Sequence, residues 1–225
     1  QQISAFCLRP GYRYDATVNQ WTQAHLKWLR ALKPEGLYLD ILMEYLSTYD
    51  QLTDKIERMD RRIEELAGEP QYREGVKKLS CFLGIKTQTA LSTMVEVGDF
   101  KRFSSAQRFA AYLGLVPGER SSSESQNRLG ITKAGNSHIR TLLVEAAQSY
   151  TRGRVGFKSK ALKERQYGNP ADVIAYADKA NERFRRKYYT MVLTKGKKVN
   201  VVKTAIAREL ACFIWGMMVG NLTER

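Results

Sequence analysis

Residues 113–147 read LGLVPGERSSSESQNRLGITKAGNSHIRTLLVEAA and place a serine cluster in a polar segment between two apolar patterns. The apolar residues on both sides recur at helical spacing, before the segment at Phe109, Tyr112 and Leu113 and after it at Ile139, Leu142, Leu143 and Ala146. Gly114 and Pro117 end the first of these helices. Because strand-like alternation is rare elsewhere in the chain, the pattern predicts a mainly α fold.

The serines Ser121, Ser122 and Ser123 are predicted to lie outside regular structure. Four cations flank them as candidate DNA contacts: Arg120, Arg128, Lys133 and Arg140. A hydroxyl among cations suits attack on a phosphodiester, since the cations stabilise charge on the phosphoryl oxygens. The alternative is that these serines are ordinary soluble turn residues, and the local pattern leaves both interpretations open.

Several blocks of the chain occur in a specific order. They are SCFLGIKTQTA, GDFKRFSSAQRFAAYLGLVPGERSSS, RLGITKAGNSHIRTLLVEAA, SKALKERQYGNPADVIAYADKANERFRRKYYTMV and ARELACFIWGMM. Together they resemble the C-terminal transposase domain of the bacterial DEDD insertion-sequence transposases, the bridge-RNA-guided recombinases. The resemblance covers roughly residues 79–219.

This resemblance implies a catalytic serine that forms a phosphoserine intermediate with DNA. By position that serine is Ser122, with Ser121 as the runner-up, because the family has glycine where this chain has Ser123. The resemblance also implies an N-terminal RuvC-like domain whose four acidic residues bind divalent metal. No acidic residue of this chain matches them, so we expect no metal site here, whereas Mg²⁺ is expected for the full-length family protein. A structured guide RNA is a further implied partner.

The composition favours a polyanionic partner. The chain has 225 residues, a net charge of +14 and a pI near 9.7, and neutralising phosphates releases counterions. The three cysteines have no CxxC spacing, which excludes a readable zinc or disulfide framework. No signal peptide or membrane-length apolar run is present. We expect a cytoplasmic, nucleoid-associated protein that does not bind membranes.

Residues 39–66 carry an apolar seam of alternating three- and four-residue steps. Its members are Leu39, Leu42, Leu46, Tyr49, Leu52, Ile56, Met59, Ile63 and Leu66. Such a seam predicts a long coiled-coil helix over roughly residues 37–67, with a mixed-charge outer face. The helix either pairs with the preceding helix of its own chain or forms a dimerisation arm. We favour a homo-oligomer, a dimer or higher.

The segment LGIKTQTA at residues 83–90 resembles the second half of a helix-hairpin-helix. In that motif a turn and the following helix N-terminus present free N–H groups to a DNA phosphate. Gly84, Lys86 and Thr87 are therefore candidate DNA contacts, with an ordinary helical turn as the alternative.

Residues 151–203 contain 15 Lys or Arg against 4 Asp or Glu, so they hold most of the excess positive charge. Arg185, Arg186 and Lys187 are the candidate DNA contacts in this segment. His138 follows the expected cap of the next helix, Asn136 or Ser137, and is interpreted mainly as a capping-region residue.

The sequence therefore predicts three parts: residues 1–36 as the segment after a nuclease domain, 37–70 as a coiled-coil arm, and 76–225 as a compact helical domain with a helix-hairpin-helix-like element. Two functions fit them. One is the DNA-binding catalytic half of a transposase or recombinase, without its metal-binding half. The other is a non-catalytic DNA-binding and dimerisation module.

Overall fold

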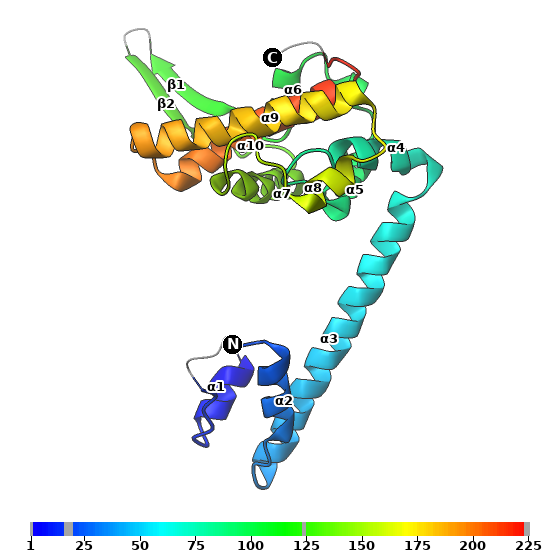
Figure 1. The fold of residues 1–225 in the computed structure, drawn as a ribbon. Coiled ribbons are helices and arrows are strands. Elements are labelled where there is room, and N and C mark those ends of the chain that lie inside the picture. Colours follow the sequence, from blue (N-terminus) through cyan, green and yellow to red (C-terminus); the bar gives the residue numbers. More distant parts are fainter. Residues whose placement is uncertain (1, 16–19, 123–124, 223–225) are drawn as a thin grey trace. The chain divides into compact units, whose positions relative to one another are not determined.

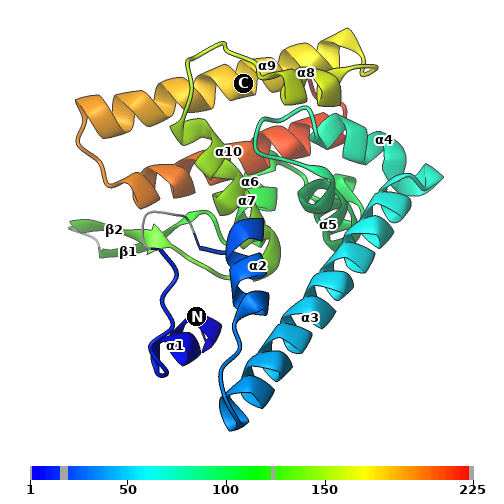
Figure 2. The same ribbon diagram turned by 60° about the horizontal axis from the view of Figure 1, so that its bottom comes forward.

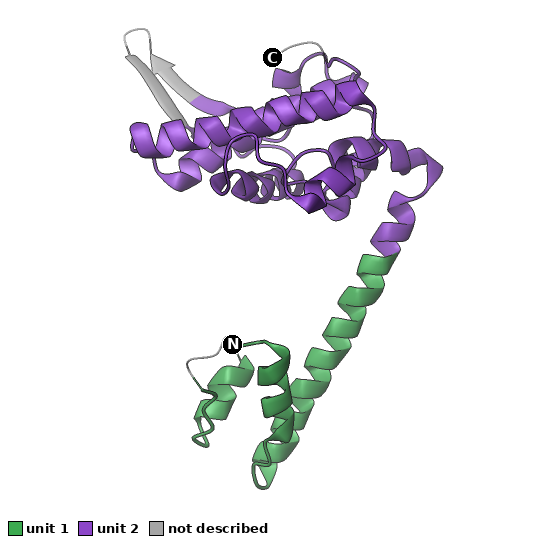
Figure 3. Cartoon of the chain, in the orientation of Figure 1, with its two compact units in different colours: residues 1–61 green, residues 62–225 purple. Residues whose placement is uncertain are grey.

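The computed structural model describes residues 2–15, 20–122 and 125–222. In the hairpin, only the backbone of residues 119–122 and 125–129 is described. The described residues are mainly helical with a single two-stranded sheet, which confirms the predicted fold class (Figure 1). The chain divides into two compact units, residues 1–61 and 62–225 (Figure 3).

The first unit contains α1 (Gln2–Leu8), α2 (Gln23–Ala31) and most of α3 (Leu37–Ala67). The Thr22 side chain caps α2 by accepting the His25 N–H, which replaces a hydrogen bond that the first helical turn lacks. One small apolar cluster holds this unit together: Ile3, Phe6, Cys7, Leu26, Leu29, Leu42 and Leu46. The preceding helix of the same chain therefore covers the first part of the seam on α3.

The middle part of that seam is not covered by described residues of the chain. The side chains of Leu52, Ile56 and Met59 are 55–60% exposed, although the helix spans the predicted residues and ends before Gly68. Ile63 and Leu66 are partly buried against the core of the second unit. Pairing with the preceding helix, the first alternative for the seam, thus accounts for Leu42 and Leu46. The middle stretch has no partner among the described residues, so a dimerisation arm stays a prediction there.

The second unit is built around α10 (Val199–Met218), a helix that packs against α6, α7 and α9 (Figure 2). The other elements are α4 (Pro70–Leu79), α5 (Thr87–Val97), η1 (Phe100–Arg102), α6 (Ala106–Tyr112), α7 (Ser137–Ala147), η2 (Gln148–Thr151), α8 (Lys160–Gln166), α9 (Ala171–Tyr189) and the π-helical turn η3 (Thr190–Thr194). Because α10 carries apolar residues on most of its surface, it is buried over much of its length.

The turn between α4 and α5 is fixed by side chains from distant parts of the chain. Arg165 donates to the Ser80 and Leu83 carbonyls, and Asn181 accepts the Leu83 N–H at 3.0 Å. Gln166 donates to the Cys81 carbonyl. These bonds satisfy backbone groups that lie outside the two helices. The α4–α5 turn is therefore held against α8 and α9.

The serine segment forms an antiparallel hairpin, with β1 at Pro117–Ser122 and β2 at Ser125–Ile131. The prediction that Ser121 and Ser122 lie outside regular structure is therefore wrong, and Ser123 lies outside the described residues. The pairing is Ser121 with Gln126 and Ser122 with Ser125. Polar strands of this kind lack the apolar alternation that identifies a strand, because backbone hydrogen bonds supply the pairing.

Candidate active site and nucleic-acid interface

Ser122 is the last residue of β1, and its backbone stands five residues beyond the base of the hairpin at Pro117. An extended strand rises about 3.3 Å per residue, so this separation is roughly 17 Å. The backbones of Arg120 and Arg128 lie on the same two strands, paired with Asn127 and Glu119. The hairpin therefore places both candidate serines near its far end, away from the helical body.

The base of the hairpin is fixed by close backbone packing. Gly114 and Gly135 both have positive φ, +66° and +83°. A Cβ on Gly114 would overlap the Ala134 carbonyl, and a Cβ on Gly135 would overlap the Tyr112 carbonyl. Both glycines thus allow the end of α6 to approach the loop before α7, where other residues would not fit.

Arg140 ties the same two segments together. Its Nη1 donates to the Leu113 carbonyl at 2.9 Å and to the Ala134 carbonyl at 3.5 Å. Its position is therefore explained by the fold, and the predicted DNA contact is not needed to account for it. Lys133, in contrast, is exposed at the base of the hairpin, with a left-handed backbone at φ +56°.

The glycine contacts lead to a stability prediction. We expect Gly135→Ala to lower the free energy of unfolding by roughly 1–3 kcal/mol more than Gly168→Ala does, because overpacking costs about that much. Gly168 is a matched control, since it has φ +78° but a Cβ added there would have nothing within 4 Å. Thermal unfolding of both variants measures the difference. An equal loss of unfolding free energy in both variants would show that the loop before α7 can shift to accommodate the added methyl group.

A carboxylate, an amide and an imidazole meet at the start of α7. Asn136 caps the helix by accepting the Ile139 N–H and donates to Glu96 Oε2 at 2.7 Å, which confirms Asn136 as the predicted cap. His138 Nδ1 contacts the other oxygen of Glu96. Burial raises the pKa of Glu96, but the hydrogen bonds from Asn136 and His138 outweigh it and keep this pKa below its usual value. The carboxylate is thus ionised and orients the exposed imidazole.

The three candidates on the helix-hairpin-helix-like turn lie in different settings. Lys86 is exposed and precedes α5 without a side-chain cap, so the first N–H groups of α5 keep their hydrogen-bonding capacity. Thr87 is the half-buried first residue of that helix. Gly84 has a packing role, because a Cβ there would overlap the Ala146 carbonyl of α7.

The prediction for Arg185 needs correcting. Its side chain is 6% exposed, and its Nη1 donates to the Arg154 and Phe157 carbonyls at 2.7 and 2.6 Å. A guanidinium in this position stabilises the loop before α8 and is not available to a ligand. The sequence could not show this, because the bonded carbonyls lie about thirty residues away along the chain.

The neighbouring cations remain closer to solvent. Arg186 is exposed and pairs with Glu182 one helical turn before it. Lys187 donates to Glu209 at 2.6 Å, and Arg183 binds the other oxygen of the same carboxylate. Burial raises the pKa of Glu209, but the bonds from Arg183 and Lys187 prevail and lower it. This cluster between α9 and α10 was not predicted, because its members lie 22 and 26 residues apart.

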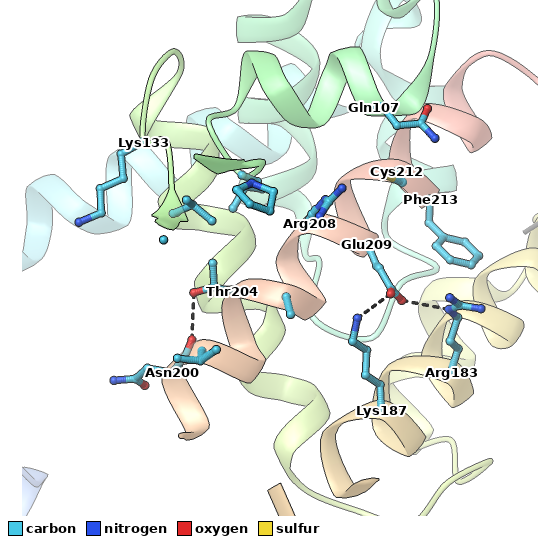
Figure 4. A pocket seen from close by; sticks show the side chains of 16 residues that line it. Gln107, Lys133, Arg183, Lys187, Asn200, Thr204, Arg208, Glu209, Cys212 and Phe213 are labelled. Atoms are coloured by element: carbon cyan, nitrogen blue, oxygen red, sulfur yellow. Dashed lines mark hydrogen bonds and ion pairs between the residues drawn. The ribbon is translucent and has the colours of Figure 1, made fainter. Parts of the chain in front are cut away.

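That cluster forms one wall of a pocket of about 1080 Å³, hereafter the α10 pocket (Figure 4). The pocket lies between α9, α10 and the base of the hairpin, where Pro117, Gly130 and Ile131 line it. Its cations are Lys133, Arg183, Lys187 and Arg208, and its carboxylate is Glu209. Arg208 is half-buried, and no ion pair or hydrogen bond joins its side chain to another described residue.

Residues 76–161 match the family model described as the transposase IS116/IS110/IS902 family. The matched range includes the α4–α5 turn, the hairpin and all of α7. This part of the chain is similar to the transposase domain of that family.

Insertion-sequence transposases are similar over more of the chain. "Putative transposase y4qE" of Sinorhizobium fredii is 37% identical over 218 residues, which are 96% of this chain and 52% of that protein. The transposase of IS1533 from Leptospira borgpetersenii is 31% identical, covering 84% of this chain and 54% of that protein. The transposase of IS1111A from Coxiella burnetii is 34% identical over 58% of this chain and 37% of its own length. The chain spans about half the length of the first two relatives.

The described residues offer neither a metal cluster nor a membrane-spanning helix. No three His, Cys, Asp or Glu side chains gather there in a way that could bind a metal ion. In the same part of the chain, none of the helices combines the length and apolar character needed to cross a bilayer.

Proposed function

We propose that this chain is the DNA-binding part of an insertion-sequence transposase and supplies its serine nucleophile. The transposase-domain match and the net charge of +14 support DNA as the substrate. The observation that carries the proposal is the position of Ser122 at the end of a hairpin with a fixed base. A hydroxyl at the far end of a hairpin can reach a phosphorus that lies away from the helical body.

In the proposed reaction the Ser122 hydroxyl attacks a DNA phosphorus. The Oγ–P bond forms, one ester P–O bond of the strand breaks, and the oxygen that leaves takes up a proton to become a free hydroxyl. The serine proton passes to solvent or to a base near the attacked phosphate. The product is a phosphoserine link that preserves the energy of the broken bond for rejoining.

The remaining parts of the proposal concern groups outside this chain. Mg²⁺ would be held by acidic residues of a RuvC-like domain, and would stabilise charge on the attacked phosphate. A structured guide RNA is proposed as a second nucleic-acid partner, consistent with the excess of cations in residues 151–203. The proposal is tested by mixing this chain with a RuvC-like domain, Mg²⁺ and labelled DNA, and by looking for a covalent adduct on a denaturing gel.

The second candidate function is a non-catalytic DNA-binding and dimerisation module. It is favoured by the exposed middle of the α3 seam, where Leu52, Ile56 and Met59 form an apolar stripe that the described residues leave uncovered. A stripe of this spacing suits a second helix. The two candidates differ in the covalent adduct, which only the catalytic function produces.

Self-association is expected to depend on this stripe. Ile56→Asp combined with Met59→Asp should convert an oligomer to a monomer, because burying unpaired carboxylates in an apolar interface costs several kcal/mol. Met43→Asp is the control, since Met43 is equally exposed on the same helix but lies outside the seam. Sedimentation equilibrium measures the mass of each variant. An unchanged mass in the double variant would remove the stripe as the contact.

A further inference from the structure

The α10 pocket has the charge and the walls of a site for an unpaired nucleic-acid strand. We propose that it binds a single-stranded stretch of DNA, with phosphates at Arg208 and Lys133 and with bases and sugars against its apolar walls. The choice of DNA rests on the proposed function. That the pocket binds an unpaired strand is inferred from the charges and the apolar side chains that line it.

The charges of the pocket are only partly compensated. Glu209 neutralises part of the charge of Arg183 and Lys187, whereas Arg208 and Lys133 have no such partner among the described residues. Figure 4 shows Arg208 on the pocket wall beside the Glu209 cluster. The Arg208 side chain is partly exposed, so its charge is uncompensated by the described residues and open to a ligand. A bound phosphate would supply both the charge and the acceptor atoms that Arg208 lacks.

The walls distinguish an unpaired strand from a duplex. The apolar lining that reaches the surface is aliphatic: Val201 is 56% exposed and Ile131 and Ala205 are partly exposed, whereas Leu115 and Phe213 are buried beneath them. A duplex presents mainly phosphates and sugars outward, so apolar walls gain little from it. An unpaired strand offers the faces of its bases, which pack on apolar side chains without regard to sequence. The pocket is therefore suited to unpaired DNA.

The position of the pocket relates it to the hairpin. Pro117 and Ile131, the first residue of β1 and the last of β2, both line it. A strand seated in the pocket would leave it at the base of the hairpin, roughly 17 Å along β1 from Ser122. The pocket would thus hold DNA that flanks the attacked phosphate, and keep the flanking bases from pairing again.

A thiol inside the pocket provides the measurement. Cys212 lines the pocket and is half-buried, whereas Cys7 and Cys81 are buried elsewhere. Burial also raises the pKa of Cys81 to about 11, which leaves little reactive thiolate there. The rate of Cys212 alkylation by a maleimide, followed by mass spectrometry on the full chain, should fall several-fold with a single-stranded DNA oligonucleotide. The matching duplex should protect much less.

Two valines with the same exposure give a matched pair of variants. Val201, 56% exposed, lines the pocket on α10, and Val95, 55% exposed, lies on α5 outside it. Val201→Glu should remove the protection of Cys212 and weaken single-strand binding by about tenfold, because the new carboxylate repels phosphate. Val95→Glu should change neither. Both positions are exposed, so neither variant disturbs the core.

The cations give a second comparison. Arg208→Ala should reduce the salt dependence of binding by about one unit and also abolish protection of Cys212. Arg186→Ala, outside the pocket, can change only the salt dependence. Protection that survives in both Val201→Glu and Arg208→Ala, or equal protection by duplex DNA, would overturn the proposal. Protection by single-stranded RNA alone would also overturn it, and would assign the pocket to RNA.

Protection of Cys212 from alkylation requires only that DNA binds, and does not require strand cleavage. If Cys212 is protected but no serine adduct forms in the complete transposase, the proposed catalytic function fails and the pocket stands. If the adduct forms but Cys212 is never protected by nucleic acid, the pocket proposal fails alone, and an apolar protein segment becomes the better occupant.

Discussion

Ser122→Ala is expected to abolish strand cleavage and the covalent protein–DNA adduct while leaving DNA affinity within about twofold. The hydroxyl is needed to form the Oγ–P bond. DNA affinity comes from many cations, so it does not depend on this hydroxyl. The variant must be tested in a protein that includes the RuvC-like part, because the described carboxylates do not provide a metal site. Adduct and cleaved strand are both measured on denaturing gels.

The neighbouring serines serve as controls that test which of the three serines is the nucleophile. Ser121→Ala and Ser123→Ala should retain most of the cleavage activity. Cleavage that survives in Ser122→Ala but disappears in Ser121→Ala would move the nucleophile by one residue. Cleavage that survives in all three single variants and in the triple variant would exclude a serine nucleophile and favour the non-catalytic module.

Arg185→Ala is expected to lower the free energy of unfolding by about 2–4 kcal/mol, because it removes two charged hydrogen bonds and leaves two carbonyls without a donor. For a chain of this size, the melting temperature should fall by roughly 5–15 °C. The salt dependence of DNA binding, measured well below the new melting temperature, should stay unchanged, since the guanidinium is buried on the carbonyls of Arg154 and Phe157.

Arg186 is the adjacent control on the same helix. Arg186→Ala removes an exposed cation with a surface ion pair, which contributes little to stability. It should change the melting temperature by no more than a degree or two and can lower the salt dependence of binding. A stable Arg185→Ala protein with a reduced salt slope would restore Arg185 as a DNA contact.

Helical elements with apolar periodicity were predictable from the sequence. α3 follows the expected spacing, and Asn136, one of the two expected caps, caps α7. In each case the determining residues lie within one or two turns of one another, so a local pattern contains the information. The sequence blocks around the hairpin resemble a transposase domain, and the family match over residues 76–161 agrees with that resemblance.

The hairpin and the roles of single side chains were not predictable in this way. The strands carry no apolar alternation, and their pairing depends on the backbone. Arg185 and Arg186 are neighbours in a basic run, yet one is buried and the other exposed. Arg208 and Glu209 join a pocket whose other walls are formed near residues 115–133 and 183–187. Such contacts depend on tertiary packing.

The hydrogen bonds that hold the α4–α5 turn also set an order of events during synthesis. The chain leaves the ribosome from its N-terminus, but the Leu83 N–H is bonded by Asn181, 98 residues later, and the Cys81 carbonyl by Gln166, 85 residues later. Helices α4 and α5 can form early, since their own hydrogen bonds are local. A chain truncated before residue 181 would therefore lack the side chain that accepts the Leu83 N–H, and one truncated before residue 165 would lack every distant donor to this turn.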